Sequence, residues 1–284
     1  MQVGLIPASG GGVPATPDFV RAVARRAEEG GFDSLWLGEH VVLPVHQRVA
    51  YPGSREGLQA PSSEPLPDPL DWLAYAAACT DRLLLGTAIL LAPLHQPLVL
   101  AKRVATLDAL SGGRLRLGVG IGWNEQEYDA VGVPFAGRGA RLEEVIAAMR
   151  ALWRDDEASF EGEHVRFEPV FSSPKPTNRA VPVVIGGKTP TAARRAGRIG
   201  DGFIPFERDL DQLATLLDVM RTAATEAGRD PDSIEVSCLG SVRRDRVARL
   251  AELGVTRMLV FMPGRDPATI DDLAARCQEA LTGV

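Results

Sequence analysis

His40 is the side chain of this sequence best suited to exchange a proton near neutral pH. It follows an apolar run over residues 34–37 that predicts a short strand, and Glu39 stands directly before it. A histidine just past a strand can serve as general acid or base; a histidine satisfied by local hydrogen bonds is the alternative. His95 also follows a predicted strand and is a second candidate.

A candidate anion site follows a later apolar run and consists of Gly186, Gly187, Lys188 and Thr189. Glycines let backbone N–H groups approach an anion, the N-terminus of the helix predicted after Thr189 favours negative charge, and Lys188 adds a cation. The segment is not a P-loop, because that motif needs a glycine where Pro182 stands. A tight strand-to-helix turn without a ligand is the alternative.

The segment 118–124 is also glycine-rich and follows a predicted strand. Trp123 occupies the position of the third glycine of a dinucleotide-binding fingerprint, so a Rossmann site is poorly supported. These glycines either let a flat ring approach the backbone or serve packing alone.

Short apolar runs alternate with helical patterns along the chain, and four prolines mark helix starts at Asp68-Pro69, Gln96-Pro97, Thr189-Pro190 and Asp266-Pro267. Strands are expected at residues 3–6, 34–37, 83–91, 114–119, 181–185, 203–205, 234–239 and 257–261. Eight such units without a linker predict an α/β fold, a TIM (β/α)8 barrel that forms one domain over residues 1–284. A doubly wound open sheet is the alternative.

Two segments interrupt this alternation. Residues 41–67, after the second strand, are rich in proline and glycine and are expected to form a lid or pocket wall, because such loops lie at the barrel mouth. A surface insertion with no role is the alternative. Residues 155–180, before the fifth strand, predict a short hairpin and a proline-marked return.

Composition excludes several classes of protein. With 45% apolar residues, 24% charged residues and a formal charge of −6, the chain is typical of a globular protein and carries no basic run for nucleic acid. Three widely spaced cysteines without a CxxC motif, and no signal peptide or membrane-length apolar stretch, predict a cytoplasmic protein. Without HxH or HExxH motifs, no metal site is expected.

Together these features resemble the bacterial luciferase-like family of flavin and deazaflavin oxidoreductases, and most closely the branch that uses coenzyme F420. The segments that carry the likeness, in order along the chain, are residues 31–40 (GFDSLWLGEH), 85–90 (LGTAIL), 111–125 (SGGRLRLGVGIGWNE) and 184–202 (from VIGGKTP to GDG).

The resemblance implies a barrel whose mouth binds the isoalloxazine-like ring. A non-prolyl cis peptide between Ala88 and Ile89 would back the ring, His40 would lie near its reactive face, and Asn124 would make a polar contact to the cofactor. The residues that would hold the cofactor phosphate are Gly186, Gly187, Lys188 and Thr189.

The activity implied is hydride transfer between F420 and a small organic substrate, with His40 moving the proton and Glu39 tuning its surroundings. The alternative within the family is a monooxygenase that uses reduced FMN and oxygen. Pro44 stands where the sugar-phosphate branch has a tryptophan, so oxidation of sugar phosphates is not carried over. Alternatives from other classes are a cofactor carrier or sensor and, less favoured, a metal-dependent hydrolase. A homodimer is expected by analogy.

Overall fold

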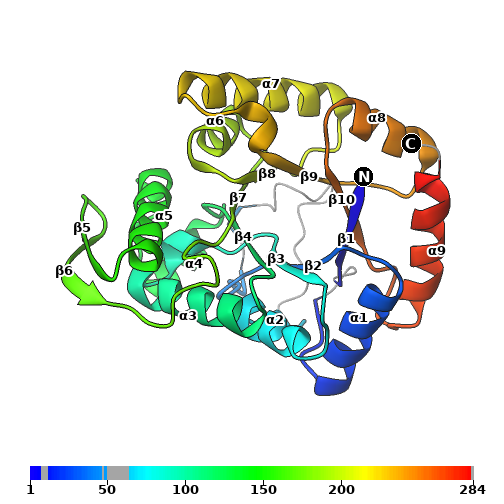
Figure 1. The fold of residues 1–284 in the computed structure, drawn as a ribbon, viewed down its shortest axis with the longest axis horizontal. Coiled ribbons are helices and arrows are strands. Elements are labelled where there is room, and N and C mark those ends of the chain that lie inside the picture. The colour runs from blue at the N-terminus through cyan, green and yellow to red at the C-terminus, as the bar shows by residue number, and fades with distance from the viewer. Residues whose placement is uncertain (8–11, 47, 50–63, 283–284) are drawn as a thin grey trace.

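Eight parallel strands close into a barrel surrounded by helices (Figure 1). The computed structural model describes residues 1–7, 12–46, 48–49 and 64–282. Around the barrel the strands run in the order β1-β10-β9-β8-β7-β4-β3-β2. Their bounds are β1 Gln2–Ile6, β2 Ser34–Leu37, β3 Leu84–Thr87, β4 Leu115–Val119, β7 Val183–Gly186, β8 Gly202–Ile204, β9 Glu235–Leu239 and β10 Arg257–Phe261. The predicted TIM (β/α)8 barrel is therefore confirmed.

The helices begin largely where proline and capping residues predict. Asp68, Gln96 and Thr189 each accept a backbone N–H at the start of a helix. The start predicted at Asp266-Pro267 was wrong, because Asp266 forms a turn with Ala268 and the helix begins later. The helices are α1 Pro17–Glu29, α2 Pro69–Ala77, α3 Pro97–Leu110, α4 Glu125–Val131, α5 Arg138–Arg154, α6 Pro190–Ile199, α7 Leu210–Glu226, α8 Arg244–Glu252 and α9 Thr269–Leu281, with 3-10 turns η1 Ala92–Leu94 and η2 Pro231–Ser233.

The third strand is shorter than the apolar run that predicts it. It ends at Thr87, and the peptide bond between Ala88 and Ile89 is cis, as the family resemblance implies. The chain then returns to the sheet at Leu90, which bridges to Val119 of β4. Continuous apolar character over residues 83–91 thus reports burial rather than unbroken strand.

A separate antiparallel hairpin, β5 Glu157–Glu161 and β6 Arg166–Phe171, projects beside α5 (Figure 1). Its turn is anchored by Glu144 of α5, whose carboxylate accepts the N–H groups of Glu163, His164 and Val165. The predicted hairpin before the fifth barrel strand is therefore present. Most of the loop predicted as a lid, residue 47 and residues 50–63, lies outside the described residues.

A buried arginine closes the amino-terminal end of the barrel, which we call the barrel floor. The Arg257 side chain is 1% exposed and donates to Asp33 at 2.7 Å, to Gln2 at 2.8 Å and to Glu235. Its guanidinium also lies 5.6 Å from the ring centre of Trp36. The buried guanidinium of Arg257 thus has both opposite charges and a hydrogen bond, as a buried ionic group requires.

Candidate active site at the barrel mouth

His40 is held by a carboxylate that is distant in sequence. Its Nδ1 lies 3.0 Å from Oε2 of Glu127, a fully buried residue of α4. The other oxygen of Glu127 accepts the N–H of Val41 at 2.7 Å, so the same carboxylate fixes the backbone after His40. When the imidazole is neutral this contact places the proton on Nδ1 and leaves the Nε2 lone pair to accept a proton.

Glu39 faces different partners. Its carboxylate accepts the N–H of Leu91 at 2.6 Å and lies 2.9 Å from Nε2 of His95. Its own N–H donates to the carbonyl of Ile89 at 3.1 Å. The expectation that Glu39 tunes His40 is corrected: Glu127 is the carboxylate bonded to His40, and Glu39 with His95 fixes the backbone after the cis peptide. Adjacent side chains on extended backbone point apart, which is why the two dyads separate.

Ile89 fits between two strands because both carry glycine at the contact. A Cβ atom on Gly120 would lie 1.9 Å from Cδ1 of Ile89, and one on Gly186 would lie 2.5 Å from its Cγ2. Any side chain at either glycine would displace Ile89. Gly120 and Gly186 therefore serve the packing of Ile89. For the glycine-rich segment 118–124 the sequence left open packing or the approach of a flat ring, and this contact is a packing contact.

Phe206, just after β8, also packs close to Gly186. Its ring comes within 3.2 Å of the position of a Cβ on Gly186, and its φ is +44°, a left-handed value that is uncommon outside glycine. Residues with such uncommon φ values are concentrated at functional sites, where the surrounding structure enforces the conformation. Phe206 was not predicted, because nothing in its sequence reports this conformation.

Asn124 supplies a hydrogen-bond donor that the described protein does not use. The residue is 3% exposed and begins α4, where its Oδ1 accepts the N–H of Gln126 at 3.1 Å. Its Nδ2 is buried and has no hydrogen-bond partner among the described residues. A buried amide without an acceptor is costly, so this group is suited to donate to an acceptor on a bound molecule. The ring of the preceding Trp123 lies edge-on to His40, with centroids 6.4 Å apart.

The predicted phosphate loop lies at the mouth beside β8. The N–H of Gly187 donates to the carbonyl of Ile204 at 3.0 Å, so this amide is already used. Thr189 caps α6 by accepting the N–H of Ala192, and its hydroxyl hydrogen is left to donate. Lys188 and Thr189 are exposed. An anion here would therefore meet the start of α6, a hydroxyl and an ammonium, but not the Gly187 amide.

Two further proton-bearing groups near the mouth are poorly suited to catalysis. Burial raises the pKa of the Tyr128 phenol, whose O–H donates to the carbonyl of Ile121. Burial likewise raises the pKa of the Cys238 thiol to about 11, so a thiolate nucleophile is absent there at neutral pH. Neither group therefore competes with His40 as a candidate proton carrier.

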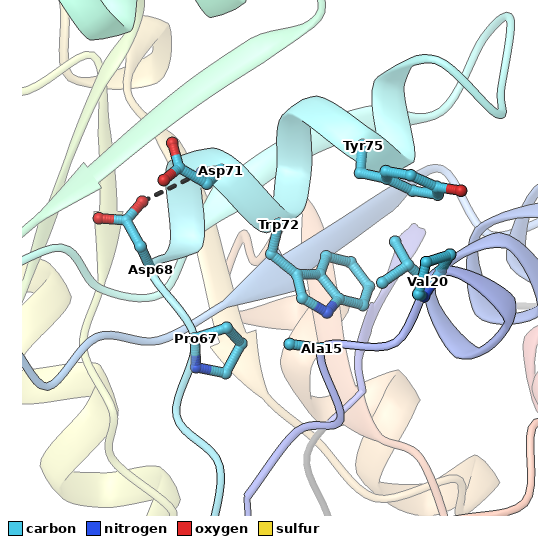
Figure 2. Close-up of a pocket in the computed structure, with 8 residues that line it drawn as sticks. Ala15, Val20, Pro67, Asp68, Asp71, Trp72 and Tyr75 are labelled. Atoms are coloured by element: carbon cyan, nitrogen blue, oxygen red, sulfur yellow. Dashed lines mark hydrogen bonds between the residues drawn. The ribbon is translucent and has the colours of Figure 1, made fainter.

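A hollow of about 270 Å³ between the start of α1 and α2 lies apart from these groups (Figure 2). Trp72, Tyr75 and Val20 line it, and Asp68 caps α2 at its edge. None of its lining residues was predicted to bind cofactor. Within the described ranges, no group of three or more His, Cys, Asp or Glu side chains is arranged to hold a metal, and no helix is long and apolar enough to cross a membrane.

Comparison with known proteins settles the family. The model of the luciferase-like monooxygenase family matches residues 3–272. The chain belongs to the luciferase-like monooxygenase family. The resemblance inferred from the four sequence segments is thereby confirmed at the level of the family.

Individual relatives and a solved structure extend the comparison. An uncharacterized protein of Mycobacterium tuberculosis is 39% identical over 257 residues, which cover 89% of both chains. An F420-dependent glucose-6-phosphate dehydrogenase of Nakamurella multipartita is 34% identical over 224 residues, 77% of this chain and 61% of the dehydrogenase. The solved structure of an F420-dependent secondary alcohol dehydrogenase with an F420-acetone adduct has a TM-score of 0.77 at 20% identity and covers 98% of both chains, which is a likeness of fold.

Glu127 is the main residue of this luciferase-like site that sequence reasoning missed. Asn124 and Glu127 have the spacing of a capping box, in which the glutamate would turn back to its own helix. Here the Glu127 carboxylate reaches His40 instead. The spacing could have drawn attention to Glu127, but only the fold brings it to residue 40.

Proposed function

We propose that this protein is an oxidoreductase that transfers a hydride between coenzyme F420 and a small organic substrate. The observation that carries the proposal is the His40–Glu127 pair at the same barrel mouth as the amide of Asn124, which has no acceptor among the described residues. F420 dependence in a relative that is 34% identical over 77% of this chain supports the choice of cofactor.

The residues of the mouth fit such a cofactor in distinct ways. Ile89, seated between glycines, offers an apolar surface for a flat ring, and Asn124 offers a buried donor to a ring acceptor. Lys188, Thr189 and the start of α6 offer positive potential for the charged tail. F420 supplies the two-electron chemistry of its deazaflavin ring, and the protein binds, orients and excludes water.

His40 is the residue that we assign to the proton. Hydride transfer to or from a polar double bond changes the protonation of the substrate, so one group must give or take a proton. The Nδ1 of His40 is held by Glu127, and we assign the exchange to Nε2. Glu127 also stabilises the imidazolium, because the carboxylate remains beside it in both protonation states.

An FMN-dependent monooxygenase is the second candidate, favoured by the name of the family itself. Both cofactors share a flat tricyclic ring, and the described residues favour neither by geometry. The nature of the bound cofactor therefore decides between the two activities.

Cofactor titration tests the proposal directly. We expect F420 to bind with quenching of its fluorescence and FMN to bind more weakly. Asn124→Asp keeps the helix cap but removes the donor, so it is expected to raise the Kd for F420 roughly tenfold. Asn178→Asp changes an exposed asparagine of a surface turn and serves as the matched control. Tight binding of FMN without binding of F420 would overturn the assignment.

A further inference from the structure

A second hollow at the barrel mouth is lined by arginines. Its volume is about 590 Å³, and it lies at the carboxyl ends of β8, β9 and β10 and beside the start of α8. The basic residues that line it are Arg208, Arg243, Arg246 and Arg249, against a single acidic one, Asp245. We call this hollow the arginine cavity. In a chain with a formal charge of −6, so local an excess of positive charge favours an anionic ligand.

The four guanidinium groups of the arginine cavity differ in their partners within the described residues. Arg243 pairs with Asp245 at 2.7 Å, and Arg249 pairs with Glu252. The side chains of Arg208 and Arg246 make no hydrogen bond or ion pair within the described parts of the chain. Guanidinium groups bind carboxylate and phosphate by paired hydrogen bonds, so these two arginines are equipped to hold such a group.

Apart from Gly240 and Ser241, the remaining wall of the arginine cavity is apolar. Leu210, Leu239 and Phe261 line it, and Phe261 is 44% exposed, an unusual exposure for a large apolar side chain at the end of a barrel strand. Charge beside apolar surface suits an amphiphilic molecule with an anionic end and a hydrocarbon or aromatic body. It suits a free inorganic anion less well.

The arginine cavity lies opposite the cis peptide across the barrel mouth. In the strand order, β9 and β3 are separated by three strands in either direction. The loop after β8 connects the two sides, since Phe206 approaches the glycine that cradles Ile89 and Arg208 lines the arginine cavity two residues later. The loop that carries Arg208 at the arginine cavity thus also carries Phe206 at the candidate cofactor site.

We propose that the arginine cavity binds the carboxylate or phosphate of the substrate, an organic anion with an apolar body, an inference that rests on the proposed function. The same anionic chemistry is present in the charged tail of F420, which is the other source of such a group. The position of the arginine cavity across the mouth from Ile89, together with its apolar wall, favours the substrate.

Calorimetric titration of the full chain, with and without F420, tests this assignment. The probes are hexanoate and hexyl phosphate, with neutral hexanol as the control ligand. We expect both anions to bind and hexanol to bind much more weakly. The variant Arg208→Ala/Arg246→Ala is expected to raise the Kd for both anions at least about tenfold, and Arg246→Lys less, because each charged hydrogen bond contributes roughly a factor of ten. Phe261→Ala is expected to weaken the binding of hexanoate but not the binding of acetate.

Arg244→Ala is the matched control variant, since Arg244 is an exposed arginine of α8 that does not line the arginine cavity. Thermal unfolding of each variant verifies the fold. Equal binding of hexanoate by the double variant and the parent chain would overturn the inference. The inference would also be overturned if the double variant bound F420 more weakly than the parent chain does but bound a deazaflavin without phosphate and tail equally well. The arginines would then serve the cofactor. If F420 failed to bind while hexanoate bound through these arginines, the proposed function would fail and the anion subsite would stand.

Discussion

The two ends of the barrel treat buried polar groups in opposite ways. At the floor, Arg257 is fully buried and bonded to Asp33, Glu235 and Gln2. At the mouth, the buried amide of Asn124 has no acceptor among the described residues. Satisfied polar groups stabilise a fold, and unsatisfied ones must be compensated by something else. The difference indicates that the floor serves stability and the mouth serves binding, as in other barrels of this type.

The arginines make the same contrast. Arg257 at the floor bonds two carboxylates, whereas the side chains of Arg208 and Arg246 at the mouth bond none within the described ranges. A guanidinium that already has its partners holds strands together, and one that lacks them can recognise a ligand. Substitutions at the two ends should therefore separate stability from activity.

The largest effect is expected from His40→Ala. Loss of the proton carrier should lower kcat by about 10²–10⁴, the usual contribution of general acid–base catalysis. The Kd for F420 should change little, because the His40 side chain is partly exposed at the mouth. The melting temperature should fall, because the buried carboxylate of Glu127 loses one of its partners. Steady-state kinetics with F420 provide the measurement. Retention of full activity would assign the proton to a different residue, and absence of turnover in the parent chain would favour a binding protein.

At the floor, Arg257→Met should lower the free energy of unfolding by about 3 kcal/mol, because it leaves two partly buried carboxylates unpaired. The rate per folded molecule should stay unchanged. Urea unfolding with and without F420 measures both properties. Arg166→Met, which removes the exposed ion pair with Glu161, is the control and should cost under about 1 kcal/mol. Equal losses of unfolding free energy in the two variants would contradict the expected difference between floor and surface.

Glu127→Gln should lower kcat at least about tenfold while the fold is kept, because an amide cannot stabilise the imidazolium as a carboxylate does. Steady-state kinetics and thermal unfolding of the variant measure both properties. Glu125→Gln, on the exposed side of the same helix, is the matched control. An unchanged kcat in Glu127→Gln would reduce Glu127 to a purely structural residue.

The smallest effect is expected at Asp68, which caps α2 at the hollow in Figure 2. Asp68→Ala should cost about 1 kcal/mol of stability and no activity. Burial alone would raise the pKa of Asp68, but Arg103 and the N–H groups of Leu70 and Asp71 hold it below its ordinary value of 3.8. The stabilisation is therefore complete above pH 3.8 and is lost as the pH falls below it. Urea unfolding midpoints of the parent chain and of Asp68→Ala between pH 3 and 7 measure this pH dependence. A difference between the two midpoints that does not change with pH would contradict the prediction.

Local sequence signals predicted the barrel well and its mouth only in part. Apolar runs and proline-marked helix starts depend on neighbours in the chain, so the eight strands could be located from sequence. His40 could be singled out because its position after a strand is a local property. Glu127 could not be assigned to it, since the contact joins residues separated by 87 positions.

Conformation and spatial clustering account for the other omissions. The left-handed φ of Phe206 is carried by a residue type that gives no hint of it. Arg208 and Arg246 lie on separate elements, and each looks like an ordinary surface arginine until the barrel brings them together. The cis peptide at Ala88–Ile89 was anticipated only through resemblance to the family, since the residues themselves do not indicate it.

The short helix α4 carries both Asn124 at its cap and Glu127 one turn later. A molecule that draws the Asn124 amide toward itself would shift this turn as a rigid unit and carry the carboxylate with it. The imidazole ring of His40 would then move in step with cofactor loading. Its NMR resonances would thus report occupancy of the mouth before any substrate arrives.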